Sequence, residues 1–136
     1  MECMRIFLDA NILISGIIFK GKEHELLIKN KNIFFITSED VLEETRAVII
    51  EKFPESSELV EIFLSILNPT VIKRKDYASK FNEYSMVRDK NDRHILAAAM
   101  IGKVDYIVTG DADLLSLKNY NNISIVQARK IVSLPE

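Results

Sequence analysis

Runs of hydrophobic residues alternate with amphipathic segments along the whole chain. The short apolar runs are typical of buried strands, because both faces of each run are hydrophobic. They lie at 5–8, 33–37, 70–72, 106–109 and 123–126. The segments between them carry apolar residues at helical spacing and predict helices at 11–19, 22–30, 38–53, 56–67, 77–84, 89–102 and 111–117. Strands that alternate with helices predict an α/β fold with a parallel sheet covered by helices on both faces.

Several predicted helix ends have recognisable boundary residues. Ser38 stands where a helix N-cap belongs, and Glu39 and Asp40 follow in the first turn, where negative charge favours the helix dipole. Pro54 ends that helix, because proline lacks the N–H that a helix interior requires. Gly102 is placed to end the alanine-rich helix that precedes it. These signals support the helix boundaries that the hydrophobic pattern predicts.

Composition indicates one ordinary globular domain over residues 1–136. The chain has 4 Gly and 3 Pro, with no repeat or linker, so little marks a second domain. Its net charge of −2 means that the chain lacks the overall positive charge of many nucleic-acid-binding proteins. A local group of basic residues beside the site would still suffice to bind RNA. A single cysteine, Cys3, cannot form an internal disulfide, which favours a cytoplasmic protein. No apolar run approaches the roughly 20 residues of a membrane span, and we expect no signal peptide.

Two aspartates follow predicted strands directly. Asp9 comes after the first strand, and Asp111 comes just after the strand that ends near Thr109. If both strands are central, the two carboxylates meet at one edge of the sheet, where ligands of parallel α/β proteins bind. Taken alone, each aspartate also fits the simpler role of a helix cap.

The helix predicted at 38–53 separates two neighbouring glutamates. Its apolar stripe is formed by Val41, Leu42, Thr45, Val48, Ile49 and Phe53. Glu44 lies at the edge of that stripe, whereas Glu43 points nearly opposite its centre. We therefore expect Glu43 to be solvated and Glu44 to be able to reach a site, although Glu44 also fits a plain amphipathic boundary.

Asp92 gives a sharper signal because it shares a face with Ile95, Leu96 and Ala99, and a carboxylate on a buried face needs a partner. Asp89 lies three residues earlier, near the same face. Carboxylates that converge repel one another, and a hard divalent cation such as Mg²⁺ or Mn²⁺ relieves that repulsion. The only histidines, His24 and His94, are far apart, so zinc is poorly supported, and we expect His94 on the exposed side of its helix.

Four segments, taken in order, resemble the motifs of the PIN-domain family, close to its VapC-like toxin members. They are Ile6–Leu13 with its D-x-N pattern, Ser38–Arg46, Asp89–Asp92 with its D-x-x-D pattern, and Tyr106–Leu115 with its T-G-D-x-D-L-L pattern. Each motif is weak alone, but their order and spacing cover nearly the whole chain. Lys90 stands where the family usually has proline, a difference that concerns the loop and not the chemistry.

The resemblance implies a three-layer α/β/α Rossmann-like PIN domain with a central, mainly parallel sheet of four to five strands. It also implies one or two Mg²⁺ or Mn²⁺ ions, hydrolysis of RNA phosphodiester bonds and a partner antitoxin. On this reading the metal ligands and catalytic residues are Asp9, Glu44, Asp92 and Asp111, with Asp89 and Asp113 as second-rank ligands. Asn11 and Thr109 support them by hydrogen bonds or stand only in turns. Arg88, Lys90 and Arg93, with Lys20 and Lys22, are candidates for an RNA-binding rim, although a solvated surface is the ordinary role of each.

Other functions fit the sequence less well. There is neither a G-x-x-x-x-G-K-[ST] nor a G-x-G-x-x-G segment, which excludes the common nucleotide-binding loops. A phosphoaspartate hydrolase requires an acid two residues after Asp9, where Asn11 stands. The remaining alternative is a catalytically inactive PIN-like RNA-binding or scaffold domain, although such a domain is expected to lack one or more of the four acids.

The helix predicted at 56–67 is hydrophobic over more than one face. Leu59, Val60, Ile62, Phe63, Leu64, Ile66 and Leu67 leave only a narrow polar face at Glu58, Glu61 and Ser65. This is wider than the stripe an ordinary surface helix needs. We predict a homodimer through this helix; the alternative is that the segment at 77–86 covers it.

Overall fold

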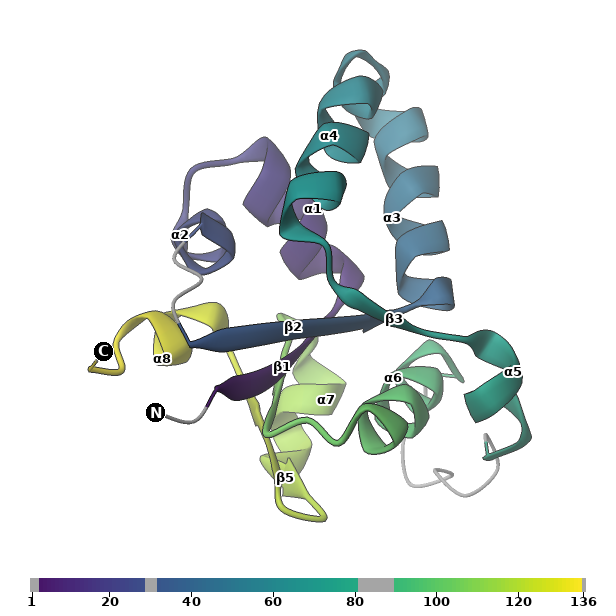
Figure 1. Cartoon of the computed structure of the whole chain (residues 1–136), viewed down its shortest axis with the longest axis vertical. Helices are drawn as coiled ribbons and strands as arrows, with labels where there is room; N and C mark the ends of the chain where they lie inside the picture. The colour runs from purple at the N-terminus through teal and green to yellow at the C-terminus, as the bar shows by residue number, and fades with distance from the viewer. Residues whose placement is uncertain (1–2, 29–31, 81–89, 136) are drawn as a thin grey trace.

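A computed structural model describes residues 3–28, 32–80 and 90–135 (Figure 1). The described residues form one sheet in the order β3-β2-β1-β4-β6-β5. Its strands are β1 (Met4–Leu8), β2 (Ile33–Ser38), β3 (Thr70–Ile72), β4 (Tyr106–Val108), β5 (Asn119–Tyr120) and β6 (Ile123–Val126). All neighbouring strands are parallel except β5, which pairs with β6 in the antiparallel direction. The predicted mainly parallel sheet is therefore confirmed, but in the described residues it has six strands and not the four to five that were expected.

Helices cover both faces of the sheet (Figure 1). One face carries α1 (Ala10–Ile18), α2 (Lys22–Ile28), α3 (Glu39–Lys52), the short 3₁₀ helix η1 (Pro54–Ser56) and α4 (Ser57–Leu67). The other carries α5 (Arg74–Tyr77), α6 (Lys90–Gly102) and α7 (Ala112–Leu117), and α8 (Ala128–Val132) packs against α2. This three-layer α/β/α arrangement agrees with the expected fold class.

The core lies where the apolar runs predicted it. Ile6, Phe7 and Leu8 of β1 are completely buried, as are Ile107 and Val108 of β4. Strands that are hydrophobic on both faces can be buried only between two helical layers. The central position of β1 and β4 follows from this burial.

Strand β5, the short helix η1 and helix α8 were not predicted from the sequence. Strand β5 has two residues and no apolar run, and a turn with Asn121 and Asn122 at positive φ joins it to β6. Helix α8 is five residues long, too short for a hydrophobic period to be recognised. The helix predicted at 77–84 is shifted, since α5 begins at Arg74. The rest of that prediction, from residue 81, lies outside the described residues.

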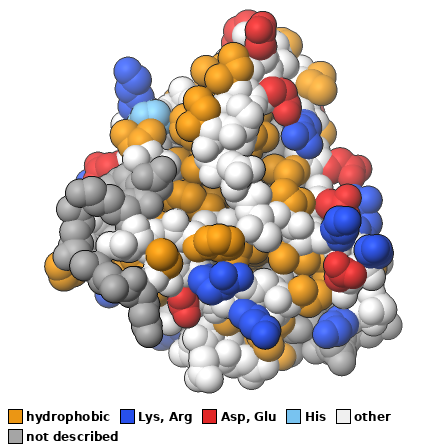
Figure 2. Space-filling view, in the orientation of Figure 1, with side chains coloured by type: hydrophobic (Ala, Val, Ile, Leu, Met, Phe, Trp, Pro, Cys, Tyr) orange, Lys and Arg blue, Asp and Glu red, His pale blue; other side chains and the backbone are white. Residues whose placement is uncertain are grey.

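The outward face of α4 carries exposed hydrophobic side chains (Figure 2). Leu59 and Ile62 are each about half exposed, and Ile66 is 79% exposed. Phe63 is half-buried, with its ring 6.3 Å from the ring of His24 on α2. Within the described part of the chain, no helix is both long enough and apolar enough to cross a membrane.

Candidate metal centre

The pairing of β1 with β4 brings two predicted site residues to the same sheet edge. Leu8 is paired with Val108, so Asp9 and Thr109 leave the sheet side by side. The backbone N–H of Asp9 donates to the carbonyl of Val108 at 3.3 Å. The carboxyl ends of two adjacent parallel strands therefore form the floor of the site, as this class of sheet predicts.

Asp9 is buried and fixed at both carboxylate oxygens. Its Oδ1 accepts from the backbone N–H of Ala10 at 2.7 Å, so it caps α1. Its Oδ2 accepts from the hydroxyl of Thr109 at 2.6 Å. Asp9 thus has the cap role that the sequence left open, and it is also tied to Thr109, the residue that follows β4.

Thr109 connects Asp9 to Asp111. Its fully buried hydroxyl donates to Asp9 and accepts from the backbone N–H of Asp111 at 3.0 Å. Asp111 caps α7 by accepting from the N–H of Leu114 at 3.0 Å. One hydroxyl therefore sets the relative position of two carboxylates that are about a hundred residues apart in sequence.

Three carboxylates come together around Asp111. One oxygen each from Asp92, Asp111 and Asp113 lies within 4.8 Å of the others. Asp92 is buried in the first turn of α6, and Asp111 and Asp113 are half-buried. Carboxylate oxygens at this spacing fit a hard divalent cation, which takes oxygen ligands and reduces the mutual repulsion of the acids. Asp113, a second-rank candidate from the sequence, lies in this cluster with Asp92 and Asp111, whereas Asp9 and Glu44 do not belong to it.

Glu44 lines a cavity that Asp9 also lines. It is exposed on α3, and the cavity, of about 300 Å³, is also lined by Asp40, Glu43 and His94. Asp9 thus lines this cavity and is joined through Thr109 to Asp111. The structure brings Asp9, Asp92, Asp111 and Asp113 to one sheet edge and places Glu44 at the rim of the adjoining cavity.

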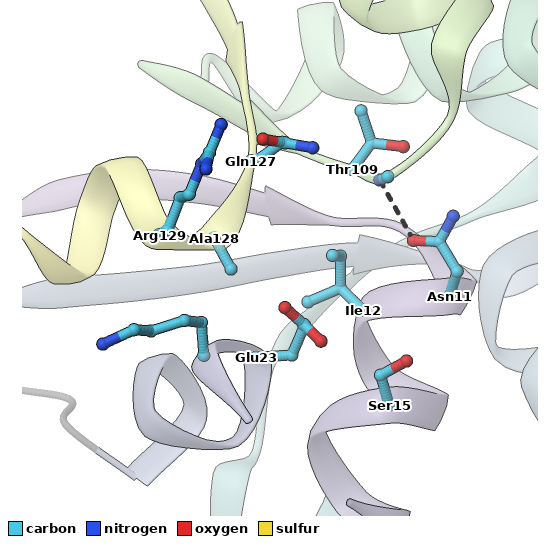
Figure 3. A pocket seen from close by; sticks show the side chains of 10 residues that line it. Asn11, Ile12, Ser15, Glu23, Thr109, Gln127, Ala128 and Arg129 are labelled. Carbon is cyan, nitrogen blue, oxygen red and sulfur yellow. Dashed lines mark hydrogen bonds between the residues drawn. The ribbon is translucent and has the colours of Figure 1, made fainter. Parts of the chain in front are cut away.

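Asn11 lies beside the site at the start of α1. Its Oδ1 accepts from the N–H of Gly110 at 3.3 Å, which ties α1 to the turn between Thr109 and Asp111 (Figure 3). Asn11, Thr109 and Gly110 also line a second cavity, of about 430 Å³. The supporting residues Asn11 and Thr109 therefore lie between this cavity and the one lined by Asp9 and Glu44.

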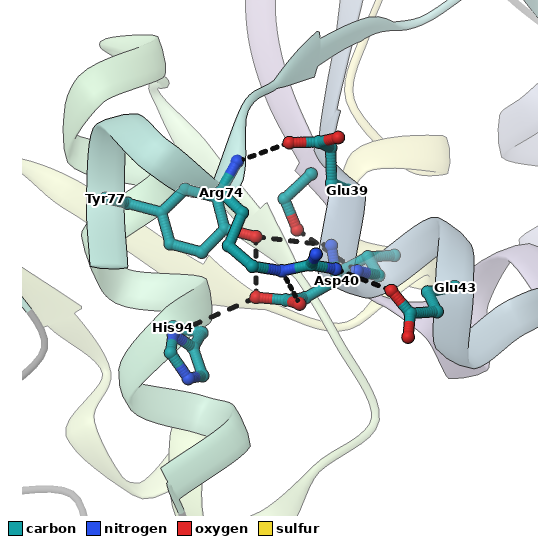
Figure 4. Close-up of polar contacts among 8 residues, drawn as sticks. Glu39, Asp40, Glu43, Arg74, Tyr77 and His94 are labelled. Carbon is teal, nitrogen blue, oxygen red and sulfur yellow. Dashed lines mark hydrogen bonds and ion pairs between the residues drawn. The ribbon is translucent and has the colours of Figure 1, made fainter.

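The acids at the start of α3 are held by a clamp that the sequence did not reveal (Figure 4). We define the Arg74 clamp as Asp40, Glu43, Arg74 and Tyr77. The guanidinium of Arg74 lies 2.6 Å from Asp40 Oδ1 and 2.6 Å from Glu43 Oε2. The hydroxyl of buried Tyr77 donates to Asp40 Oδ2 at 2.6 Å. Glu43 is largely exposed, as predicted, but it is also paired with Arg74.

Ionisation in the clamp is shifted by these contacts. Burial acts to raise the pKa of Asp40, but hydrogen bonds from Tyr77 and Arg74 outweigh it and hold that pKa below its ordinary value. Burial, with the Asp40 hydrogen bond, raises the pKa of Tyr77 to about 12. Hydrogen bonds to Asp40 and Glu43 raise the pKa of Arg74. At neutral pH the clamp therefore contains an ionised Asp40, a neutral Tyr77 and a charged Arg74.

The other predicted residues have mixed outcomes. The expectation that His94 faces solvent is wrong: it is half-buried, lines the cavity with Asp9, and its Nδ1 is 3.9 Å from Asp40 Oδ2. Arg93 is half-buried on α6. Arg88 and Asp89 lie outside the described residues, and so does the side chain of Lys90. Their predicted roles remain predictions.

Comparison with known proteins gives one family match and several similar folds. The PIN domain model matches residues 5–113 of this chain. The structure of VapBC2 from Rickettsia felis, bound to a DNA fragment from their promoter, contains a chain 21% identical to this one, with a TM-score of 0.61. That match covers 90% of this chain and 97% of the other. VapC20 of Mycobacterium tuberculosis, described as a sarcin-ricin loop cleaving toxin, is 18% identical with a TM-score of 0.64, over 88% of this chain and 98% of the other.

At these identities the two structures establish a shared fold and no more, and no curated protein matches the chain. The family match is independent of them and covers most of the chain, from β1 to the aspartates that open α7. It includes Asp9, Glu44, Asp92, Asp111 and Asp113. On this match, and with the three-layer fold and the carboxylates at the sheet edge in agreement, the chain belongs to the PIN domain family.

Proposed function

We propose that this protein is a metal-dependent endoribonuclease that hydrolyses RNA phosphodiester bonds. The observation that carries the proposal is the convergence of Asp92, Asp111 and Asp113 within 4.8 Å, with Asp9 joined to them through Thr109. Membership of the PIN domain family supports it, and so does the description of the similar VapC20 as a toxin that cleaves the sarcin-ricin loop.

The proposed metal ligands are Asp9, Glu44, Asp92 and Asp111, with Asp113 as a further ligand and Mg²⁺ or Mn²⁺ as the ion. A bound divalent cation lowers the pKa of a coordinated water and stabilises negative charge on the attacked phosphate. The chain itself supplies the geometry. Thr109 and the first turns of α1 and α7 hold Asp9 and Asp111 in fixed orientations before any substrate arrives.

Glu44 plays a different part in this proposal. It is exposed at the rim of the cavity that also contains Asp9, on a helix whose first turn is fixed by the Arg74 clamp. A glutamate on a rigid helix at the rim of this cavity can approach the metal by side-chain rotation, without moving the backbone. The clamp therefore acts as support, because it holds the beginning of α3 against α5.

Cleavage assays test this proposal directly. The purified chain is incubated with mixed single-stranded RNAs in Mg²⁺, in Mn²⁺ and in EDTA, beside an Asp9→Asn variant purified in the same way. We expect cleavage with either metal, none in EDTA and none with the variant, which controls for contaminating nuclease. Intact RNA in both metals would reject the nuclease and favour an inactive RNA-binding or scaffold domain.

We also propose that the protein is the toxin of a toxin-antitoxin pair and works in the cytoplasm. The support is the fold shared with the R. felis VapBC2 complex and with VapC20. Expression in a bacterial host, alone and together with the product of the neighbouring gene, tests this. Growth arrest that the neighbour relieves is expected, and normal growth with a chain that is active in vitro would contradict it.

A homodimer through α4 is the proposed assembly, because Leu59, Ile62 and Ile66 present apolar surface outward. The described part of the segment thought able to cover it packs elsewhere, since Tyr77 lies against Asp40 and His94. Phe63 is half-buried, so a charge there would damage the fold and is a poor test. Sedimentation of Ile66→Glu beside the polar-face control Ser65→Glu should show a monomer only for Ile66→Glu. A monomeric wild type would contradict the dimer.

A further inference from the structure

A second cavity, of about 430 Å³, opens beside the metal centre between α1, α2 and α8 (Figure 3). It is lined by Asn11, Thr109 and Gly110 on the side of the acidic site. The hydroxyl of Thr109 is hydrogen-bonded to Asp9, so this wall of the cavity is in direct contact with a proposed metal ligand. Anything bound in this cavity is adjacent to a phosphate held at the acids.

The walls of the cavity are fixed by the packing of α2 on α1. Gly16 of α1 allows this close approach, because a Cβ there would overlap Leu27 Cδ1. His24 Nδ1 is hydrogen-bonded to the carbonyl of Gly16 at 2.8 Å. The first turn of α2, with Lys22 and Glu23, is thereby held over the cavity, and Arg129 of α8 stands opposite α1 (Figure 3).

Lys22 and Arg129 give the cavity a cationic rim in a chain whose net charge is −2. Both are exposed, and both also line a neighbouring hollow that includes Lys130. The Lys22 ammonium is 3.6 Å from Glu25 across a largely exposed helical pair. Such exposed pairs are weak, so Lys22 remains available to a phosphate. The cations form a path that leads away from the acidic site.

The interior of the cavity offers hydrogen bonds of both kinds. The carboxylate of Glu23 points between α1 and α8 (Figure 3). Asn11 uses its Oδ1 on Gly110, so its Nδ2 offers two N–H donors. Gln127 begins α8 without capping it by its side chain, and its amide lines the cavity. The carboxylate of Glu23 and the side-chain amides of Asn11 and Gln127 together suit the polar edge of a nucleobase, which has both donors and acceptors.

We propose that this cavity binds one unstacked nucleotide of the RNA, next to the phosphodiester that is cut. Lys22 and Arg129 hold the phosphate of that nucleotide, and Glu23 reads its base. The volume is within the range of small-molecule sites, and a base paired in a duplex could not enter it. The proposal rests on the ribonuclease function and names the part of the substrate that this cavity takes.

The carboxylate of Glu23 favours guanine. Guanine presents two adjacent N–H donors, at N1 and N2, which match the two oxygens of a carboxylate. Uracil has one N–H on this edge, and adenine and cytosine present one amino group beside an acceptor nitrogen. Single-stranded substrates with guanine beside the cut are therefore the expected class.

Binding without cleavage tests the subsite. A short single-stranded RNA is titrated with the full chain in EDTA, and fluorescence anisotropy is followed at several salt concentrations. Lys22→Ala/Arg129→Ala should bind about tenfold more weakly, with the salt slope smaller by about 0.7 for each phosphate that the variant no longer neutralises. The control Lys52→Ala/Lys103→Ala removes two charges from residues outside the cavity and should bind like the wild type. Equal affinity of both double variants, or no binding by the wild type, overturns the proposal.

Base preference tests Glu23. Wild type should bind an oligonucleotide of adenine and uracil with one guanine more tightly than the same oligonucleotide without guanine, and Glu23→Gln should lose this preference. A guanine preference that persists in Glu23→Gln overturns the assignment of this residue. Neither binding experiment needs turnover, so the nuclease and the nucleotide-binding cavity are tested separately. A wild type that binds RNA through Lys22 and Arg129 but cuts nothing would reject the proposed nuclease and uphold nucleotide binding in the cavity.

Discussion

Two groups of acidic side chains lie on the same edge of the sheet, and their hydrogen bonds differ in kind. Asp40 and Glu43 are tied to the guanidinium of Arg74 at 2.6 Å each. Asp9 and Asp111 accept hydrogen bonds from uncharged donors, namely the hydroxyl of Thr109 and the backbone N–H groups of Ala10 and Leu114. The Arg74 clamp neutralises its acids, whereas the bonds from Thr109 and the two amides orient theirs without neutralising them.

On the proposed function, this contrast separates acids that stabilise the fold from acids that would hold a cation. A carboxylate beside an arginine gains little from a metal, because its charge is already compensated. A carboxylate held by neutral donors keeps both its orientation and its charge, and a metal ligand requires both. The predictions below test this division between the two groups.

The largest effect is expected from loss of charge in the acidic site. Asp9→Asn or Asp111→Asn should reduce metal-dependent RNA cleavage by more than about a hundredfold, because each removes an anionic ligand from the cluster. The fold should persist, and in EDTA the melting temperature should not fall, because the repulsion among the acids is smaller. Initial rates with Mn²⁺ and thermal melts measure both. Cleavage at the wild-type rate would remove these residues from the mechanism.

The acids of this site could be predicted because each stands at a recognisable structural position. Asp9 directly follows an apolar strand, Asp111 comes shortly after another, and Asp92 lies on a buried helical face. Parallel strands place such residues at one edge whatever the remaining sequence is. The hydrophobic pattern was also sufficient to locate β1, β2, β4 and α3. The structure has each of these elements within two residues of its predicted bounds.

The Arg74 clamp could not be predicted in this way. Arg74 and Asp40 are 34 residues apart, and no periodicity links an exposed arginine after β3 to the first turn of α3. His94 was misplaced for the same reason: its partners Asp40 and Tyr77 come from other elements. Pairs of polar side chains depend on tertiary contacts, which local sequence patterns do not encode.

Two adjacent glutamates sharpen the comparison, since Glu43 belongs to the clamp and Glu44 is a proposed metal ligand. Glu44→Gln should slow cleavage about tenfold to a hundredfold, the usual range for disturbing a metal site. Glu43→Gln should leave the rate near that of the wild type, because it loses only an exposed pair with Arg74. Both side chains are exposed, so the fold should tolerate either change. A slower enzyme from Glu43→Gln than from Glu44→Gln would show that the division is wrong.

Thr109→Val tests whether uncharged donors position the acids. The substitution keeps the volume but removes the hydroxyl that bonds to Asp9 and to the N–H of Asp111. The buried groups left behind should cost about 1–3 kcal/mol of stability. Cleavage should fall about tenfold and recover partly at high Mn²⁺ concentration, because the ligands remain but are less well oriented. Urea melts and rates across a Mn²⁺ titration separate the two effects. A rate that does not depend on Thr109 would contradict its positioning role.

The smallest effect is expected in the clamp, and it concerns stability against pH. The pKa of Asp40 in the folded chain is below the ordinary value of 3.8, so the folded state favours the ionised carboxylate. That contribution is complete above pH 3.8 and is lost as the pH falls below 3.8 through the lower folded pKa. Asp40→Asn should therefore melt at a lower temperature than the wild type at pH 7, and the difference should shrink as the pH falls below 3.8. Tyr77→Phe removes the hydroxyl that donates to Asp40 Oδ2 and accepts from the Asp40 N–H, and should cost about 1 kcal/mol for each bond at pH 7. Its cleavage rate should stay close to that of the wild type, because Tyr77 supports α3 and does not line either cavity at the sheet edge. Thermal melts from pH 7 to pH 2 and rates at neutral pH provide the measurements. A constant difference between Asp40→Asn and the wild type across the acid range would show that the carboxylate charge of Asp40 does not stabilise the fold.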